Sequence, residues 1–170
     1  MLSRGALILL ATLVLVGISA CDLGMVNTET EPVSEQMLAL SSEYTRYTKV
    51  TAQPFGSALG DFKVVEYISS NAAEFRKIKP SVTGSGAKMP VGTLIVREVL
   101  DATGAPSKLT LMGKGPAGYD ARLGDWWFGV TDLNGEPIAD AAGNPQIGKM
   151  VACHACHNER GSDDFLFGAN

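Results

Sequence analysis

The chain has 170 residues, of which 45% are hydrophobic and 19% charged, a composition typical of one globular domain with a buried core. Its 14 lysines and arginines are outnumbered by 18 aspartates and glutamates. This balance argues against a nucleic-acid-binding protein, because phosphates require a basic face. No internal repeat is visible, and no apolar run reaches the roughly 18 residues of a membrane-spanning helix.

The first twenty residues are typical of a bacterial export signal. Arg4 gives a positive start, residues 6–18 form an apolar stretch, and two small residues follow. The next residue is Cys21, and the sequence "ISAC" resembles the cleavage site of lipoprotein signals. The resemblance implies a lipid on Cys21, which would anchor the chain to a membrane in the bacterial periplasm or cell envelope. The alternative is an ordinary secretory signal followed by an incidental cysteine.

The segment after the signal predicts a tether and then a helix. Residues 21–36 are rich in Glu, Thr, Asn, Ser and Pro, so they bury too little apolar surface to order themselves. We therefore expect the domain to span residues 37–170. At its start, Leu40, Tyr44 and Tyr47 recur at helical spacing, which predicts an amphipathic helix packed on a sheet.

The middle of the chain predicts strands more than helices. Asp61–Ile68 has β-rich composition, and Asn71 is placed to cap a short helix that continues through Lys77. Gly92–Leu100 is a strong strand pattern. Its alternation puts Arg97 on one face with Thr93, Ile95 and Val99, and puts Leu94, Val96, Glu98 and Leu100 on the other.

Turn signals join the later strands. A turn at Asp101–Gly104 leads into Ser107–Met112, which we expect to return antiparallel. Asp125–Asp132 predicts a further strand, closed by the turn dipeptide Asn134–Gly135. The fold expected is therefore α+β, dominated by an antiparallel β-sheet with a few packed helices.

Both histidines and two of the three cysteines lie in "VACHACHNER", residues 151–160. Three chemistries suit such a cluster: a redox dithiol, a zinc site, and a covalently attached haem. A redox C-x-x-C motif normally follows a strand in a thioredoxin-like unit, which is missing before this motif. Zinc normally takes four ligands from two separated arms, and five consecutive residues cannot surround one ion.

The sequence C-x-x-C-H is the attachment motif of c-type haem. It predicts one haem per chain, with thioether bonds to Cys153 and Cys156 and with His157 as the axial ligand of the iron. His154 lies between the two cysteines and should point elsewhere, either into solvent or against residues that surround the site. Since no histidine exists outside the motif, Met89, Met112 and Met150 are the candidates for a sixth ligand, and each is otherwise a flexible core residue.

Seven segments in this order resemble the cytochrome P-460 and cytochrome c′-beta family. They are "YTRYTKVT", "VVEYISSNAAEF", "MPVGTLIVREV", "LTLMGKG", "GDWWFGVTDLNG", "CHACH" and "DDFLF", which together run from Tyr44 to Phe167. The resemblance implies an antiparallel sheet, a homodimer, and a five-coordinate haem with an open distal face. Members of this family bind nitric oxide and related molecules, and the P-460 branch oxidises hydroxylamine.

One position departs from the P-460 branch. A lysine in the strand matching "GTLIVRE" is covalently linked to the haem ring in that branch, and the matching residue here is Arg97. A crosslink requires a free amine, whereas a guanidinium stays protonated, so we expect no crosslink and feeble hydroxylamine oxidation. Lys88 and Lys114 are nearby amines, but nothing in their spacing recommends either as a substitute.

Arg97 has two interpretations. It is either a hydrogen-bond donor on the distal side of the haem, or a sheet-surface arginine paired with a neighbouring carboxylate. Five aromatic residues are expected in structural roles. Trp126, Trp127 and Phe128 are expected in the core and at the dimer contact, and Phe165 and Phe167 over the haem or the sheet.

Two functions remain open from the sequence. The first is an exported haem protein that binds nitric oxide or a related nitrogen oxide and takes part in its redox conversion, with a redox partner cytochrome. The second is an electron-transfer cytochrome in which a methionine closes the sixth position.

Overall fold

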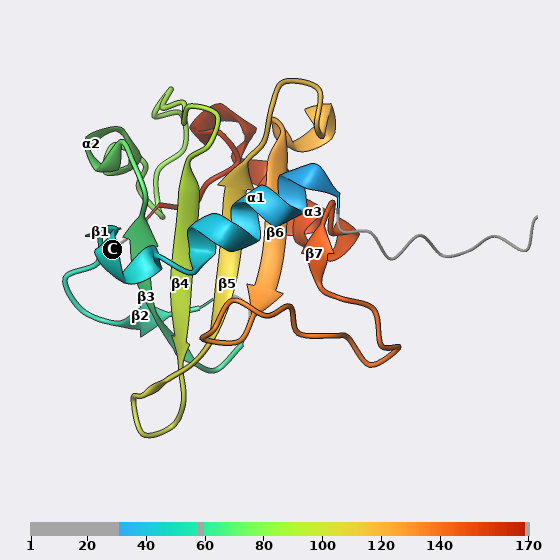
Figure 1. Ribbon diagram of the computed structural model, residues 1–170. Coiled ribbons are helices and arrows are strands. Elements are labelled where there is room, and N and C mark those ends of the chain that lie inside the picture. Colours follow the sequence, from blue (N-terminus) through green and yellow to red (C-terminus); the bar gives the residue numbers. More distant parts are fainter. Residues whose placement is uncertain (1–30, 58–59, 169–170) are drawn as a thin grey trace, which may run out of the picture.

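The computed structural model describes residues 31–57 and 60–168. The expected signal segment and Cys21 lie outside the described residues. In the described part of the chain, strands pair antiparallel into one sheet in the order β1-β3-β4-β5-β6-β7, and β2 also pairs with β3 (Figure 1). The strands are β1 (Thr48–Lys49), β2 (Phe55–Gly56), β3 (Lys63–Ile68), β4 (Leu94–Leu100), β5 (Pro106–Lys114), β6 (Trp126–Thr131) and β7 (Ile147–Gly148).

The described helices are α1 (Pro32–Ser41), α2 (Ala72–Phe75) and α3 (Val151–His157). Three 3-10 helices accompany them: η1 (Tyr44–Arg46), η2 (Ala121–Leu123) and η3 (Asn158–Asp163). The predicted fold class, α+β dominated by an antiparallel sheet, is confirmed. No helix among the described residues is long and apolar enough to span a bilayer.

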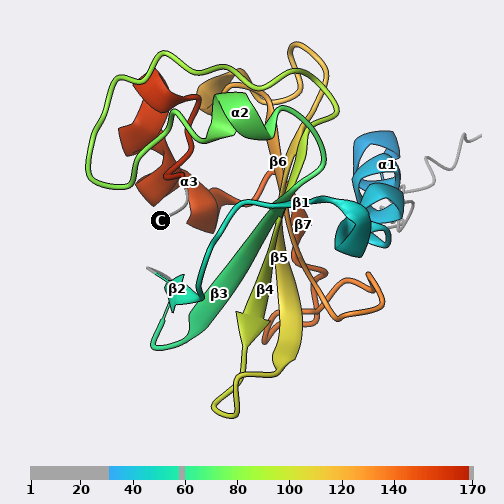
Figure 2. The ribbon, with the colours of Figure 1, turned by 90° about the vertical axis from the view of Figure 1, so that its left-hand side faces the viewer.

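The two faces of the sheet carry separate cores, and Figure 2 shows α1 on one side of the sheet and α2 and α3 on the other. Helix α1 lies over one face, where Met37 packs against Leu94, Val96 and Trp127. On the other face, Ile95 belongs to a second buried cluster. This division follows the predicted alternation along β4, because successive side chains of a strand point to opposite faces. Each cluster includes one of the two adjacent tryptophans, and both tryptophans are fully buried, as expected of core residues.

The N-terminal boundary and two local predictions differ from the structure. Helix α1 begins at Pro32, within the expected tether, because proline suits a first helical turn and Met37 anchors the helix to the sheet. The predicted helix through Tyr44 and Tyr47 is wrong, since α1 ends at Ser41 and only a 3-10 turn follows. Asn71 does precede α2, but its backbone is left-handed (φ 55°) and its side chain makes no cap hydrogen bond.

Three turns share the sequence pattern D-x-x-G-x-P: "DATGAP" (101–106), "DLNGEP" (132–137) and "DAAGNP" (140–145). In each, one aspartate oxygen accepts hydrogen bonds from the backbone N–H groups two and four residues later. The glycine of each turn has φ of 88–89°, which a residue without Cβ adopts readily. Each turn is therefore closed by its own residues, and the first of them joins β4 to β5.

Candidate functional site

A cavity of about 420 Å³ lies against the sheet face opposite α1. This volume is within the range of small-molecule and cofactor sites. Most of its lining is apolar, and it comes from β2 to β6, α2, α3 and the segment after η3. Figure 2 shows α3 and the C-terminal segment on this side of the sheet.

Two rows of side chains form the sheet wall of the cavity. The strand register places Glu66 beside Arg97, Arg97 beside Thr110, and Thr110 beside Val130, so these side chains share a face. The next row on this face contains Ile95, Met112 and Phe128, again in register. All seven side chains line the cavity.

Helix α3 forms the opposite wall and carries the C-x-x-C-H motif. Cys153, Cys156 and His157 are spaced three and four residues apart, which places them on one side of a helix. All three line the cavity, so the structure brings the predicted attachment residues together with Arg97. His157 is the last residue of the helix and is followed directly by η3.

The imidazole of His157 is held in one orientation. Its Nδ1 lies 2.6 Å from the carbonyl oxygen of Phe165, and because a carbonyl can only accept, Nδ1 must carry the proton. The other ring nitrogen, Nε2, is thereby left with its lone pair. Phe128 and Phe167 pack edge-on against the ring, each at 5.2 Å between centroids. Burial lowers the pKa of His157, which favours the neutral imidazole that binds metals.

The carbonyl that orients His157 is placed by an unusual backbone turn. Asp164 and Phe165 both have left-handed φ, 54° and 63°, which is uncommon for two successive residues other than glycine. The turn is fixed by contacts far along the chain. Asp164 Oδ2 accepts a hydrogen bond from the backbone N–H of Met89 at 2.8 Å, and its carbonyl accepts one from Trp126 Nε1 at 2.7 Å.

Asp163 and Arg160 also bind the loop of residues 79–89. Together with Asp164 they form a clasp between this loop and the C-terminal segment. Asp163 accepts hydrogen bonds from the backbone N–H groups of Gly84 and Ser85. Arg160 donates to the carbonyls of Lys79 and Val82 at 2.8 and 2.9 Å. The clasp therefore holds the segment that follows the motif against a loop from the middle of the chain.

The two motif cysteines are free thiols in the structure. Burial, and secondarily the neighbouring Cys156, raises the pKa of Cys153 to about 11. Redox-active C-x-x-C motifs depend on a thiolate with a lowered pKa, so this environment disfavours the dithiol alternative. Within the described residues, no three His, Cys, Asp or Glu side chains gather as a metal-binding group.

Arg97 lines the cavity and is paired with a carboxylate, as the second of its two interpretations expects. Its Nε donates to Glu66 Oε1 at 2.6 Å, and its guanidinium lies 5.9 Å from the centre of the Phe55 ring. Glu66 is fully buried. Burial raises the pKa of Glu66, and the charge of Arg97 only partly offsets this. Glu66 was not among the residues expected at the site, although an acid inside the apolar run "VVEYI" was a usable signal.

The other residues considered from the sequence take different places. Met112 and Met150 line the cavity, whereas Met89 is buried in the core beside it. No lysine among the described residues lines the cavity. Lys114 instead binds Asp164 at 2.7 Å, and Lys88 lies 3.7 Å from the same carboxylate.

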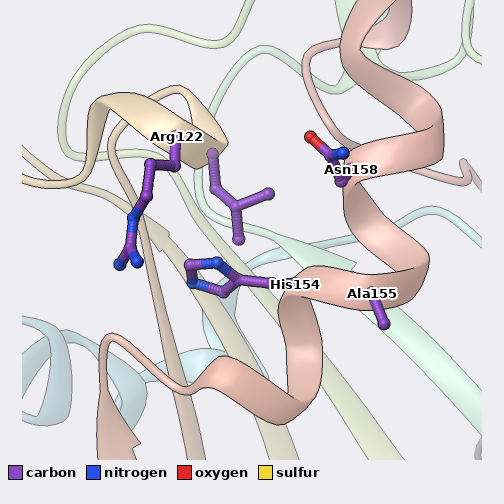
Figure 3. A pocket seen from close by; sticks show the side chains of 5 residues that line it. Arg122, His154, Ala155 and Asn158 are labelled. Carbon is purple, nitrogen blue, oxygen red and sulfur yellow. The ribbon is translucent and has the colours of Figure 1, made fainter.

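His154 points away from the cavity and lines a separate pocket of about 290 Å³ (Figure 3). The labelled neighbours in this pocket are Arg122, Ala155 and Asn158. The Nε2 atom of His154 lies 3.3 Å from Asp120 Oδ2. Arg122 donates to the same carboxylate, from Nε to Oδ1 at 2.9 Å and from Nη2 to Oδ2 at 3.0 Å. His154 is thus largely buried beside an ion pair rather than solvated.

Comparisons with known proteins assign no family to the chain. No family model matches it, and no curated protein matches it. The cavity and the motif that lines it are therefore the features of the chain that indicate a function.

Proposed function

We propose that this chain is an exported c-type cytochrome that holds one haem in the cavity and binds nitric oxide or a related nitrogen oxide. One observation carries the proposal. Cys153, Cys156 and His157 line a single, mostly apolar cavity, and the Phe165 carbonyl leaves Nε2 of His157 as the available ligand atom. An apolar pocket closed by two thiols and one oriented imidazole fits a covalently attached haem.

Each residue of the motif has a distinct role in this proposal. The sulfurs of Cys153 and Cys156 would hold the haem by thioether bonds, and Nε2 of His157 would bind its iron. When bound, the haem supplies an iron that takes small ligands and changes its oxidation state. The Phe165 carbonyl fixes the tautomer and the angle of His157, and Phe128 and Phe167 keep water from the ring.

Arg97 and the apolar wall act on the ligand side. A guanidinium held by Glu66 is a fixed, permanently charged donor, suited to stabilise the negative end of a bound nitrogen oxide. Arginine in this position also leaves the ring without an amine crosslink. Redox conversion of nitric oxide or hydroxylamine would accordingly be slow. The same proposal includes that the chain forms a homodimer and exchanges electrons with a partner cytochrome.

A second function keeps support from one observation. Met112 and Met150 both line the cavity, so either side chain offers a sulfur for the sixth position of the iron. The protein would then transfer electrons without binding nitrogen oxides. An optical spectrum separates the two functions: high-spin ferric haem that binds carbon monoxide once reduced supports the first, and a low-spin spectrum with a methionine-to-iron band supports the second.

Covalent attachment is tested by mass spectrometry of the denatured protein from a host that matures c-type cytochromes. The wild-type chain should retain the mass of one haem, and the Cys153→Ala/Cys156→Ala variant should retain none. His154→Ala is the matched control within the motif and should retain the haem fully. Haem that extracts freely from the wild-type protein into acidified solvent would remove the basis of the proposal.

The membrane anchor is tested separately. Labelled fatty acid should enter the wild-type protein and not the Cys21→Ala variant, which should leave the membrane fraction or remain uncleaved. A fully soluble, unlabelled wild-type protein would favour the ordinary secretory signal.

A further inference from the structure

One carboxylate oxygen of Glu66 accepts no hydrogen bond from the described residues. Oε1 accepts from Arg97, but within the described residues no group donates a hydrogen bond to Oε2. The side chain is fully buried and lines the cavity. A buried carboxylate oxygen without a donor is unfavourable, because it has lost its contacts with water and gained none in the protein.

The charge of the cavity wall depends on this one carboxylate. Among the described lining residues, the ionisable side chains are Glu66 and Arg97 on the sheet, and Cys153, Cys156 and His157 on α3. Arg97 stays protonated throughout the accessible pH range. In the proposed holoprotein, the two thiols are thioethers and His157 is occupied by the iron. Among the lining residues that the structure describes, Glu66 is then the one side chain able to gain or lose a proton.

An anion in the cavity would act directly on Glu66. The carboxylate is buried on the same wall as Arg97, where charges are poorly screened, so a second negative charge favours its protonated form. Burial already raises the pKa of Glu66 despite the contact with Arg97. Protonation would let Oε2 donate rather than accept, and would leave the charge of Arg97 to the anion.

We infer that the cavity binds small anionic ligands together with a proton, and that Glu66 is the residue that holds this proton. The anion would enter the cavity from solution, and the proton would pass from the buffered solvent to the Glu66 carboxylate, so the site would gain no net charge. The inference rests on the proposed function, since it requires a haem with an open position. It adds a specificity for ligands that bind as an anion together with one proton. The affinity for such anions is high at low pH and falls as the pH rises.

Fluoride is a suitable probe because it binds ferric haem and accepts hydrogen bonds. We would titrate the ferric holoprotein with fluoride by calorimetry, in two buffers of different ionisation heat, across a range of pH. The wild-type protein should take up close to one proton per fluoride within a defined pH range. This range lies between the pKa of Glu66 in the fluoride-free protein and its higher pKa in the fluoride complex. In that range the affinity should fall about tenfold per pH unit.

Three variants isolate the residue responsible. Glu66→Gln keeps the acceptor for Arg97 and should bind fluoride with no coupled proton in this range. Glu66→Asp keeps a carboxyl and should retain the uptake at a shifted pH. Glu98→Gln is the matched control, because Glu98 lies on the opposite sheet face, bound to Tyr44 and Tyr67, and should behave as wild type. Infrared difference spectra should show a carboxylic acid signal on fluoride binding that is lost only in Glu66→Gln.

The outcomes separate the inference from the function beneath it. Fluoride that binds wild type and Glu66→Gln with equal proton uptake overturns the inference and leaves the haem proposal intact. Uptake lost in Glu98→Gln as well would also overturn it, by showing a general effect of the sheet. A wild-type haem that does not bind fluoride at all would refute the open position, and the inference with it.

Discussion

Removal of Arg97 should destabilise the protein in a way that depends on pH. In Arg97→Leu, Glu66 loses the partner that lies 2.6 Å away and remains fully buried. Breaking a buried ion pair by deleting one partner typically lowers the free energy of unfolding by about 3–5 kcal/mol. The Arg97 side chain is 22% exposed, so solvent screens the pair only modestly and we expect this range at neutral pH.

The direction of the pH dependence follows from Glu66. Its pKa is raised in the folded chain, so between the unfolded and folded values the folded state binds more protons and loses stability as the pH rises. Because Arg97 holds that pKa down, its removal extends this loss to higher pH. The destabilisation should therefore be smallest below about pH 4, where Glu66 is protonated in both proteins, and largest at neutral pH.

Urea unfolding of the holoprotein, followed by circular dichroism from below pH 4 up to pH 8, measures this effect. The double variant Arg97→Leu/Glu66→Gln should recover most of the neutral-pH loss, since it carries no buried charge. Arg46→Leu breaks the exposed pair with Glu43 and should change the free energy of unfolding by less than about 1 kcal/mol at any pH. A loss in Arg97→Leu that is the same at every pH, or that the double variant does not relieve, would refute the reasoning.

Three further predictions concern stability. Asp101→Asn should lower the melting temperature at neutral pH, because hydrogen bonds from Thr103 lower the pKa of Asp101 and so stabilise the folded chain. The wild-type chain loses this stabilisation as the pH falls through the lowered pKa of folded Asp101. The melting temperatures of the two proteins should therefore converge in acid. Gly168→Ala should destabilise by more than about 1 kcal/mol in urea unfolding, because the added Cβ meets the Ile78 carbonyl, whereas Gly143→Ala, also at positive φ, has open space and should cost less. Ser34→Ala should lower the free energy of unfolding by about 1–3 kcal/mol, because buried Trp127 Nε1 loses its acceptor. An unchanged urea midpoint would contradict the packing of α1 on the folded domain.

The strands that line the cavity were predictable because their side chains alternate. Gly92–Leu100 was expected to divide into two faces, and β4 has Ile95 and Arg97 on the cavity side with Leu94 and Val96 on the other. The partner of Arg97 was not predictable. The contact with Glu66 depends on the register between β3 and β4, which is a long-range property that neither segment encodes alone.

The motif shows the same division between local and distant information. The spacing C-x-x-C-H was enough to single out Cys153, Cys156 and His157 as candidate site residues. The acceptor that orients His157 was not evident, because it depends on left-handed backbone at Asp164 and Phe165. That backbone is stabilised by contacts with Met89 and Trp126, which propensity in the segment cannot reveal.

The repeated D-x-x-G-x-P turns bear on how the protein can diversify. Residues 101–106, 132–137 and 140–145 close their turns by themselves, and none of them lines the cavity. Turn geometry fixes the register of a hairpin, so β4 and β5 stay aligned whatever side chains face the ligand. The alignment of β4 and β5 is therefore supported by residues outside the cavity wall. Such a sheet is a durable frame on which natural selection can change what the pocket prefers while the architecture persists.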